Sequence, residues 1–177
     1  KQEIEEERER MGYLHDIIRE TGRLLVIAVK KTLETLGFES VIDVDEEMKE
    51  RGEDGPKRED LQVLDISPIL LVEIKGISGK PSDDDVLQVD KYLAPRMREW
   101  NRTDIKGLSI INHERHLPAL ERDNDTLFRE DLLTNADEQE LGLLTTWDLF
   151  RLVRSFLKNN WSSENVKPLF YQSGRIE

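Results

Sequence analysis

The sequence contains no cysteine, which excludes disulfide bonds and thiolate metal sites and is compatible with a reducing cytosol. No apolar run approaches the roughly 20 residues that span a bilayer, and no secretory signal peptide is recognisable. We therefore expect a cytoplasmic protein without a membrane segment. Position 1 is a lysine and not a methionine, so we expect a trimmed chain or a piece of a longer polypeptide with further domains.

Basic residues are in deficit, with 26 Lys and Arg against 38 Asp and Glu and a formal net charge of −12. This balance is unfavourable for a nucleic-acid-binding protein, because phosphate contacts come from Lys and Arg. The acidic excess lies mainly in the first ninety residues, and residues 91–122 hold seven basic against four acidic residues. Either the acidic part is a solvated face, or nucleic acid approaches the later basic segments with help from a partner protein or another domain.

A chain of 177 residues suits one hydrophobic core. Residues 1–20 begin with an almost wholly charged run, which predicts a solvated helical extension, and residues 21–177 are expected to form the domain. Helical apolar spacing continues to Gly37, a natural helix stop. We predict strands at 39–44, 59–66, 69–76, 106–112 and 141–146. Helices are predicted from Ser82 to about Pro95, ending at 136–140, and over 147–157. Residues 45–59 are predicted to be a loop.

The segment 59–76 is predicted to be a hairpin whose loop is Ser67-Pro68. In that register Asp60 lies opposite Lys75 and Gln62 lies opposite Glu73, so the charged side chains share one face of the sheet. The apolar residues then point to the other face, as a core requires: Leu61, Val63, Leu70, Val72 and Ile74. A shift by one residue would separate Asp60 from Glu73.

Two carboxylates on a half-buried hairpin destabilise a fold unless something pairs them. Oxygen ligands from Asp60, Glu73 and the carbonyl of Ile74 would form half of a Mg²⁺ site, with water and a substrate phosphate completing it. Lys75 could then orient an attacking water. The alternative is a surface Glu/Lys pair on an edge strand.

These residues resemble the motif of the PD-(D/E)XK, or restriction-endonuclease-like, nucleases: Asp60 followed by Glu73-Ile74-Lys75. Gln88 and Tyr92, four residues apart, are similar to the Gln-x-x-x-Tyr motif of the RecB-type members. The resemblance implies an α/β/α sandwich with a central mixed sheet of four to five strands and Mg²⁺ or Mn²⁺ as cofactor. It also implies hydrolysis of nucleic acid, DNA more than RNA, in a defence or repair system.

One departure favours an alternative function. Related sequences carry a glutamate in the opening helix about eleven residues before the closing Gly-Phe, and Leu25 and Val26 stand there in this chain. A nuclease fold kept as a weakly active or inactive module, for binding nucleic acid or assembling proteins, is therefore the second hypothesis. The choice between internal cutting and cutting from ends stays open.

Three basic residues, Lys91, Arg96 and Arg122, are candidates for nucleic-acid contact, with surface ion pairs as the alternative. Lys57 and Arg58 precede the predicted site and are further candidates for substrate contact. His113 and His116 are three residues apart, but the absence of cysteine makes a structural zinc site an unfavoured interpretation.

Overall fold

The computed structural model describes the backbone of residues 2–177 and the side chains of Glu5 and residues 11–177. Its centre is a mixed six-stranded sheet in which spatial order follows chain order. The strands are β1 (Val41–Asp43), β2 (Leu61–Val63), β3 (Ile69–Gly76), β4 (Ile105–Asn112), β5 (Gly142–Thr145) and β6 (Gly174–Arg175). The first three strands pair antiparallel and β3 to β6 pair parallel. The predicted α/β class and mixed sheet are confirmed.

The predicted number of strands, four to five, is wrong because the chain end contributes a sixth. The amide of Gly174 donates to the carbonyl of Leu141 at 2.8 Å, and the amide of Ile176 donates to Leu143 at the same distance. A two-residue strand is too short to show an alternating pattern, so only its pairing with β5 reveals it.

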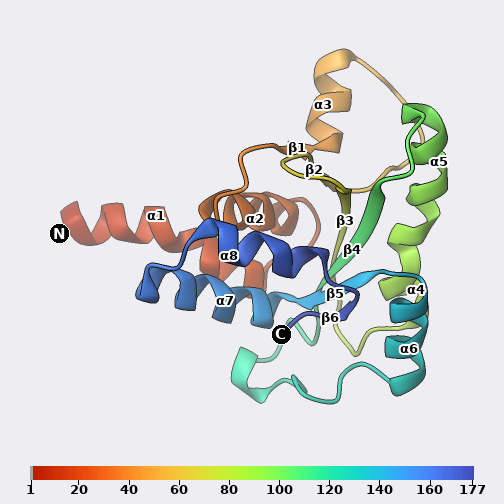
Figure 1. Ribbon diagram of the computed structural model, residues 1–177. Coiled ribbons are helices and arrows are strands. Elements are labelled where there is room, and N and C mark those ends of the chain that lie inside the picture. The colour runs from red at the N-terminus through yellow and green to blue at the C-terminus, as the bar shows by residue number, and fades with distance from the viewer. Residues whose placement is uncertain (1) are drawn as a thin grey trace.

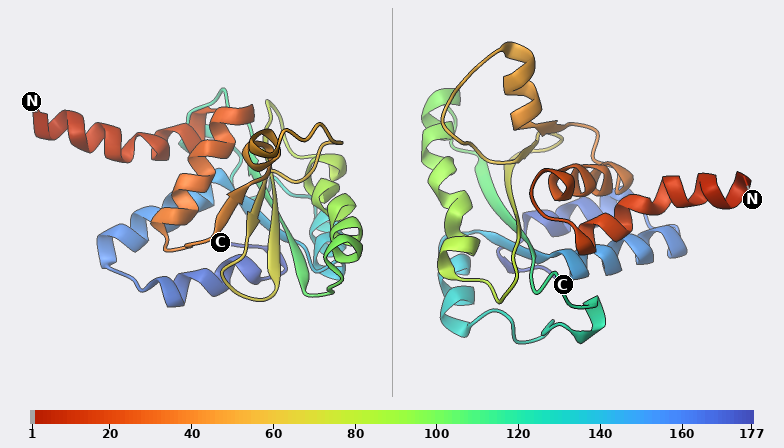
Figure 2. Two further views of the ribbon diagram at one scale, coloured as in Figure 1. Left: turned by 90° about the horizontal axis from the view of Figure 1, so that it is seen from above. Right: turned by 180° about the vertical axis from the view of Figure 1, so that it is seen from behind.

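Helices cover both faces of the sheet, as parallel strands require (Figure 1, Figure 2). One face carries α1 (Gln2–Arg19), α2 (Gly22–Thr35), α7 (Thr146–Asn159) and the short α8 (Ser163–Val166). The other face carries α4 (Asp83–Val86), α5 (Asp90–Trp100) and α6 (Glu130–Glu138). Each helical layer encloses its own apolar cluster against the sheet. On β3, Leu70 and Val72 belong to the first cluster and Leu71 to the second, as strand alternation demands.

The opening helix is more than a charged extension. Its second half buries Tyr13, Leu14 and Ile17 in the same cluster as α2, and the hydroxyls of Tyr13 and Thr35 are hydrogen-bonded at 2.9 Å. The charged residues 1–10 lie, apart from Glu5, outside the described side chains. The apolar stripe therefore joins α1 to the core from Met11 onward.

The loop predicted at 45–59 is partly wrong, because α3 (Val44–Arg51) occupies its first half. The side chain of Asp43 accepts a hydrogen bond from the amide of Glu46 and caps the helix, and Gly52 ends it in a left-handed conformation. The acidic residues in its first turn and the basic residues in its last turn interact favourably with the helix dipole. These capping signals outweigh the loop-like composition of the segment.

Two other helix predictions need adjustment. Ser82 forms a capping box with Asp85, as expected for the start of α4, but a 3-10 turn over Leu87–Val89 separates α4 from α5. Pro95 lies inside α5 without ending it. The helix predicted over 147–157 begins at Thr146, and the Thr145 hydroxyl caps it by accepting the amide of Asp148 at 3.0 Å.

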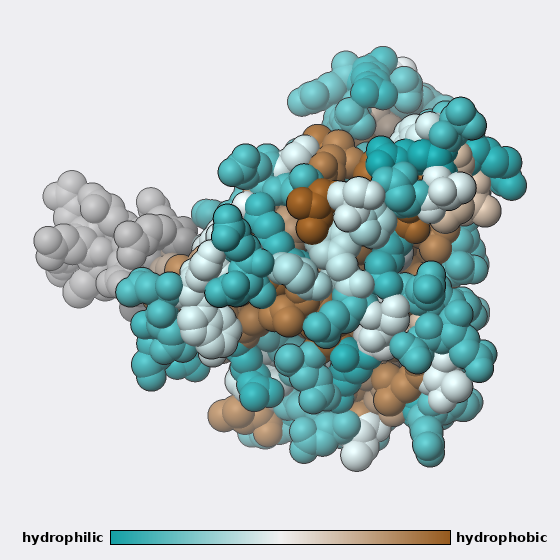
Figure 3. All heavy atoms as spheres, in the orientation of Figure 1, coloured by the Kyte–Doolittle hydropathy of each residue, from teal (hydrophilic) through white to brown (hydrophobic). Residues whose placement is uncertain are grey.

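The face of the molecule seen in Figure 3 is largely hydrophilic, with separate apolar patches among the polar side chains. Among residues 2–177, no helix combines the length and the apolar character that crossing a bilayer would require.

Candidate active site

The hairpin that carries the predicted site is paired two residues away from the predicted register. Gln62 lies opposite Leu71 and not Glu73, and Leu61 lies opposite Val72. The amide of Asp60 donates to the carbonyl of Val72 at 3.0 Å, so continuing this register places Asp60 opposite Glu73. Because the shift is even, every side chain keeps the face that the sequence predicted.

The register differs because the connection between β2 and β3 spans residues 64–68, longer than the predicted Ser-Pro loop. Asp65 anchors it: its carboxylate accepts the amides of Glu39 and Ser40 at 2.8 and 2.9 Å. The ammonium of Lys167 lies 3.0 Å from the same carboxylate. These partners are distant in sequence, so the length of the loop could not be derived from the hairpin alone.

Glu73 is the chemically unusual residue of the site. Its side chain is 1% exposed, its Oε1 accepts a hydrogen bond from Nε2 of Gln88 at 2.7 Å, and its Oε2 has no partner among the described residues. Burial, followed by the charge of Asp60, raises the pKa of Glu73 to about 7. A buried carboxylate with an unpartnered oxygen is costly to keep, and a perturbed pKa of this kind marks a functional candidate.

Asp60 stands beside Glu73 at the start of β2. Its Oδ2 accepts the backbone amide of Ile74 at 2.7 Å, and burial raises its pKa although that hydrogen bond lowers it. The Ile74 amide points toward the β2 side of β3, where the carbonyl of the same residue also lies in extended backbone. Asp60 and Glu73 thus bring two carboxylates together beside the backbone of Ile74, and oxygen donors of this kind are those that a hard divalent cation takes.

Lys75 follows on the same face of β3. Its ammonium lies 3.4 Å from Oδ1 of Asp85, and the other oxygen of Asp85 accepts the amide and hydroxyl of Ser82 at 2.9 and 2.7 Å. The capping box of α4 thus holds a carboxylate in place for the lysine. The contact between Asp85 and Lys75 was not predicted, because it joins two elements that meet only in the folded chain.

The helical layer over this face contributes Gln88 and Tyr92. The amide of Gln88 donates to Glu73 and lies 3.3 Å from the hydroxyl of Tyr92, so the two residues share a face as their spacing predicted. Gln88 fixes the orientation of the buried glutamate.

Lys57 is the basic residue nearest to Glu73, with its ammonium 3.9 Å from Oε1 and its side chain 67% exposed. It lies in the segment between α3 and β2, and its charge lowers the pKa of Glu73 against the larger effect of burial.

No carboxylate from α2 joins the site. The position expected to carry a glutamate is Val26, which is buried in the first apolar cluster. The start of α2 does lie against the end of β3, since the hydroxyl of Thr21 donates to the carbonyl of Gly76 at 3.2 Å. The structure therefore places Asp60 beside Glu73 without a carboxylate from α2.

Two of the three predicted nucleic-acid contacts are engaged inside the protein. Arg96 is buried and its Nε lies 2.8 Å from Oε1 of Glu59, a fully buried carboxylate that sequence reasoning passed over. Arg122 is also buried and donates to backbone carbonyls and to Asn112. Only Lys91 stays at the surface. We therefore do not expect the side chains of Arg96 and Arg122 to contact duplex nucleic acid.

The histidine pair does not converge on a common point. His113 is fully buried and His116 is exposed. Among the described residues, no group of three or more His, Cys, Asp or Glu side chains is arranged to hold a metal ion. A cation held by two carboxylates and a carbonyl would take its other ligands from water and substrate.

Comparison with protein-family models, with curated proteins and with solved structures found no match to this chain.

Proposed function

We propose that the chain is a metal-dependent nuclease of the restriction-endonuclease-like type, hydrolysing phosphodiester bonds of nucleic acid. The observation that carries the proposal is Glu73, a buried carboxylate with an unpartnered oxygen, placed opposite Asp60 with Lys75 on the same strand face. A fold keeps such a costly group where a ligand compensates for it.

In this proposal Asp60, Glu73 and the carbonyl of Ile74 hold Mg²⁺ or Mn²⁺. The cation, when bound, polarises the scissile phosphate and lowers the pKa of a coordinated water. Gln88 holds the Glu73 carboxylate in one orientation, as outer partners of metal ligands commonly do.

Lys75 orients the attacking water and offsets negative charge on the phosphate. Asp85, at 3.4 Å, positions its ammonium. Lys57, exposed beside Glu73, binds a non-bridging phosphate oxygen. Nothing in this set reads base edges, so we expect cleavage without sequence preference from the site itself. DNA is the preferred substrate in this proposal, in a defence or repair setting.

Incubation with plasmid, linear duplex and single-stranded DNA, and with RNA, in Mn²⁺ or in EDTA tests the proposal. We expect Mn²⁺-dependent cleavage that is lost in Glu73→Gln and in Lys75→Met. Glu138→Gln and Lys49→Ala are matched controls, because both residues are exposed on helices outside the site, and they should cleave as the wild type does.

The second candidate is a nuclease fold that binds without turnover, which the buried Val26 in place of a glutamate favours. It predicts that wild type and Glu73→Gln behave alike in every cleavage assay while both bind nucleic acid. Cleavage that persists in Glu73→Gln or in EDTA would refute the metal-dependent mechanism.

A further inference from the structure

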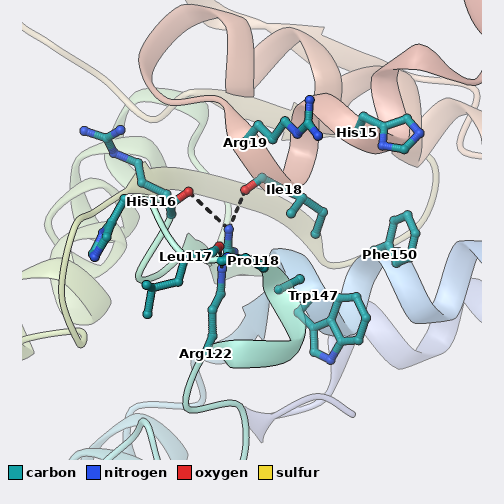
Figure 4. Close-up of a pocket in the computed structure, with 11 residues that line it drawn as sticks. His15, Ile18, Arg19, His116, Leu117, Pro118, Arg122, Trp147 and Phe150 are labelled. Carbon is teal, nitrogen blue, oxygen red and sulfur yellow. Dashed lines mark hydrogen bonds between the residues drawn. The ribbon is translucent and has the colours of Figure 1, made fainter.

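A cavity of about 430 Å³ lies outside the site just described. It is lined by the end of α1, the connection after β4 and the start of α7 (Figure 4). Phe150 of this lining packs in the first apolar cluster, whereas Tyr92 packs in the second. A volume of this size suits a ligand of one nucleotide or similar.

The lining combines basic and aromatic side chains without any acidic one. Arg19, Arg115 and Arg122 line the cavity, with His15 and His116 at its sides. No carboxylate lies within ion-pair distance of the three arginines among the side chains that the structure describes. The charge of Glu114 acts on Arg122 from outside the lining. In a chain with a net charge of −12, a pocket lined by three arginines and by no acidic side chain favours an anion.

Arg122 forms the rear of the cavity. It is buried, and its guanidinium donates to the carbonyls of Ile18 and Arg115 at 2.8 and 3.3 Å and to the amide oxygen of Asn112 at 2.8 Å. Figure 4 shows its guanidinium directed at the first two of these partners. All these acceptors are neutral, so the positive charge of Arg122 persists beneath the pocket.

The opposite wall is aromatic. Trp147 and Phe150 at the start of α7 are stacked, with ring centroids 5.5 Å apart and an interplanar angle of 13°. Trp147 is only partly buried, and Figure 4 shows both rings on one side of the cavity. A planar face beside guanidinium groups is the combination that binds an unstacked base and its phosphate.

Basic charge continues from the pocket along α7. The guanidinium carbon of Arg154 lies 5.7 Å from the centre of the Phe150 ring. Arg151, Arg154 and Lys158 line a second hollow of about 300 Å³ on the same helix. A chain of phosphates leaving the pocket therefore meets further basic groups.

The pocket also lies at the same end of the sheet as the candidate active site. The amide of Ile77 donates to the carbonyl of Asn112 at 2.9 Å, and the amide of Arg115 donates to Ile77 at 3.2 Å. The segment that carries Arg115 thus runs beside the chain two residues after Lys75. Ligands of open α/β sheets bind at the carboxyl ends of parallel strands.

We propose that this cavity binds one nucleotide of a single-stranded nucleic acid, with the base against Trp147 and the adjoining phosphates on Arg19 and Arg115. This inference rests on the proposed function and extends it, since it specifies a single strand as the form of the substrate. A base must leave its stack to enter an inward hollow, so a single strand enters more readily than a duplex.

Binding of a short fluorescein-labelled oligothymidylate, measured by anisotropy in EDTA, tests the pocket. An abasic oligomer of equal length should bind about 5- to 150-fold more weakly, because a base stacked on an aromatic ring contributes about 1–3 kcal/mol. This comparison requires no variant and is unaffected by misfolding. Quenching of tryptophan fluorescence by the oligothymidylate should disappear in Trp147→Leu but persist in Trp161→Leu.

Arg19→Ala and Arg115→Ala should each weaken binding about five- to tenfold and reduce the slope of log affinity against log salt by about 0.7. Arg98→Ala is the matched control, an exposed arginine on α5 in the opposite helical layer, and should bind as the wild type does. Equal affinity for the normal and abasic oligomers would overturn the proposal. So would equal effects of the three arginine variants, or equally tight binding of polyglutamate, which would indicate an acidic peptide site.

The assay separates this inference from the proposed function. Because binding is measured in EDTA, it does not depend on the metal site. A wild-type protein that fails to bind the oligomer would therefore contradict the pocket proposal alone. A protein that binds the oligomer through the pocket but never cleaves in Mn²⁺ contradicts the nuclease proposal alone.

Discussion

Replacing Glu73 by glutamine should stabilise the metal-free protein at alkaline pH. The pKa of Glu73 rises from an ordinary 4.5 to about 7 on folding. At about 1.4 kcal/mol per pKa unit, that difference corresponds to about 3 kcal/mol. Glutamine keeps the oxygen that accepts from Gln88 and removes the charge whose burial is unfavourable.

The sign follows from proton binding. Between pH 4.5 and about 7 the folded carboxyl group keeps a proton that the unfolded one has lost. The free energy of unfolding of the wild type therefore falls as pH rises through this window. The Glu73→Gln variant has no titrating group at this position, so this decrease in stability should be absent from it. From about pH 5 to about pH 8 the stability difference should change by about 2–3 kcal/mol in favour of the variant.

Urea unfolding in EDTA at the two pH values measures this change. Glu138→Gln, an exposed substitution of the same kind, should show no change with pH. Adding Mn²⁺ at the higher pH should stabilise the wild type by mass action but leave Glu73→Gln unaffected. A Glu73→Gln variant that is equally destabilised at both pH values would refute the claim that the buried carboxylate is ionised at a cost to the fold.

Three further changes have defined outcomes. Gln88→Ala should lower the affinity for Mn²⁺ about 10- to 100-fold, measured by calorimetry, and should also lower the thermal midpoint, because Oε1 of Glu73 loses its hydrogen bond. Arg96→Ala should lower the free energy of unfolding by about 3–5 kcal/mol, because it leaves Glu59 buried and uncompensated; adding Glu59→Gln should recover part of the loss, and no recovery would contradict the ion-pair explanation. Gly107→Ala should destabilise by about 1–3 kcal/mol in urea unfolding, since its Cβ would lie 2.8 Å from Leu141; a neutral effect would mean that the neighbouring side chains move aside.

The shared face of Asp60, Glu73 and Lys75 could be predicted from the local sequence pattern. Side chains alternate along a strand, so their shared face depends only on whether the register shift is odd or even. The predicted register was two residues away from the observed one. Because this shift is even, the three side chains still lie on one face of the sheet, as predicted. Gln88 and Tyr92 were likewise related by helical spacing, and the structure brings them together.

The segment 44–51 shows a different kind of failure. Its capping residues, Asp43 and Gly52, were present in the sequence, but its charged composition favoured a loop. The signal was local and was outweighed. The sixth strand offered no local signal, because a two-residue strand exists only through its neighbour.

The sequence by itself determined which residues share a face, where most elements begin and which side chains carry the candidate chemistry. Tertiary structure alone decided that Arg96 and Arg122 are buried, that Lys75 meets Asp85, and that Arg19, Arg115 and Trp147 enclose a cavity. The reason is the range of the interactions. Periodicity and capping act between residues a few positions apart, whereas burial and charge pairing depend on segments that meet only when the sheet and both helical layers assemble.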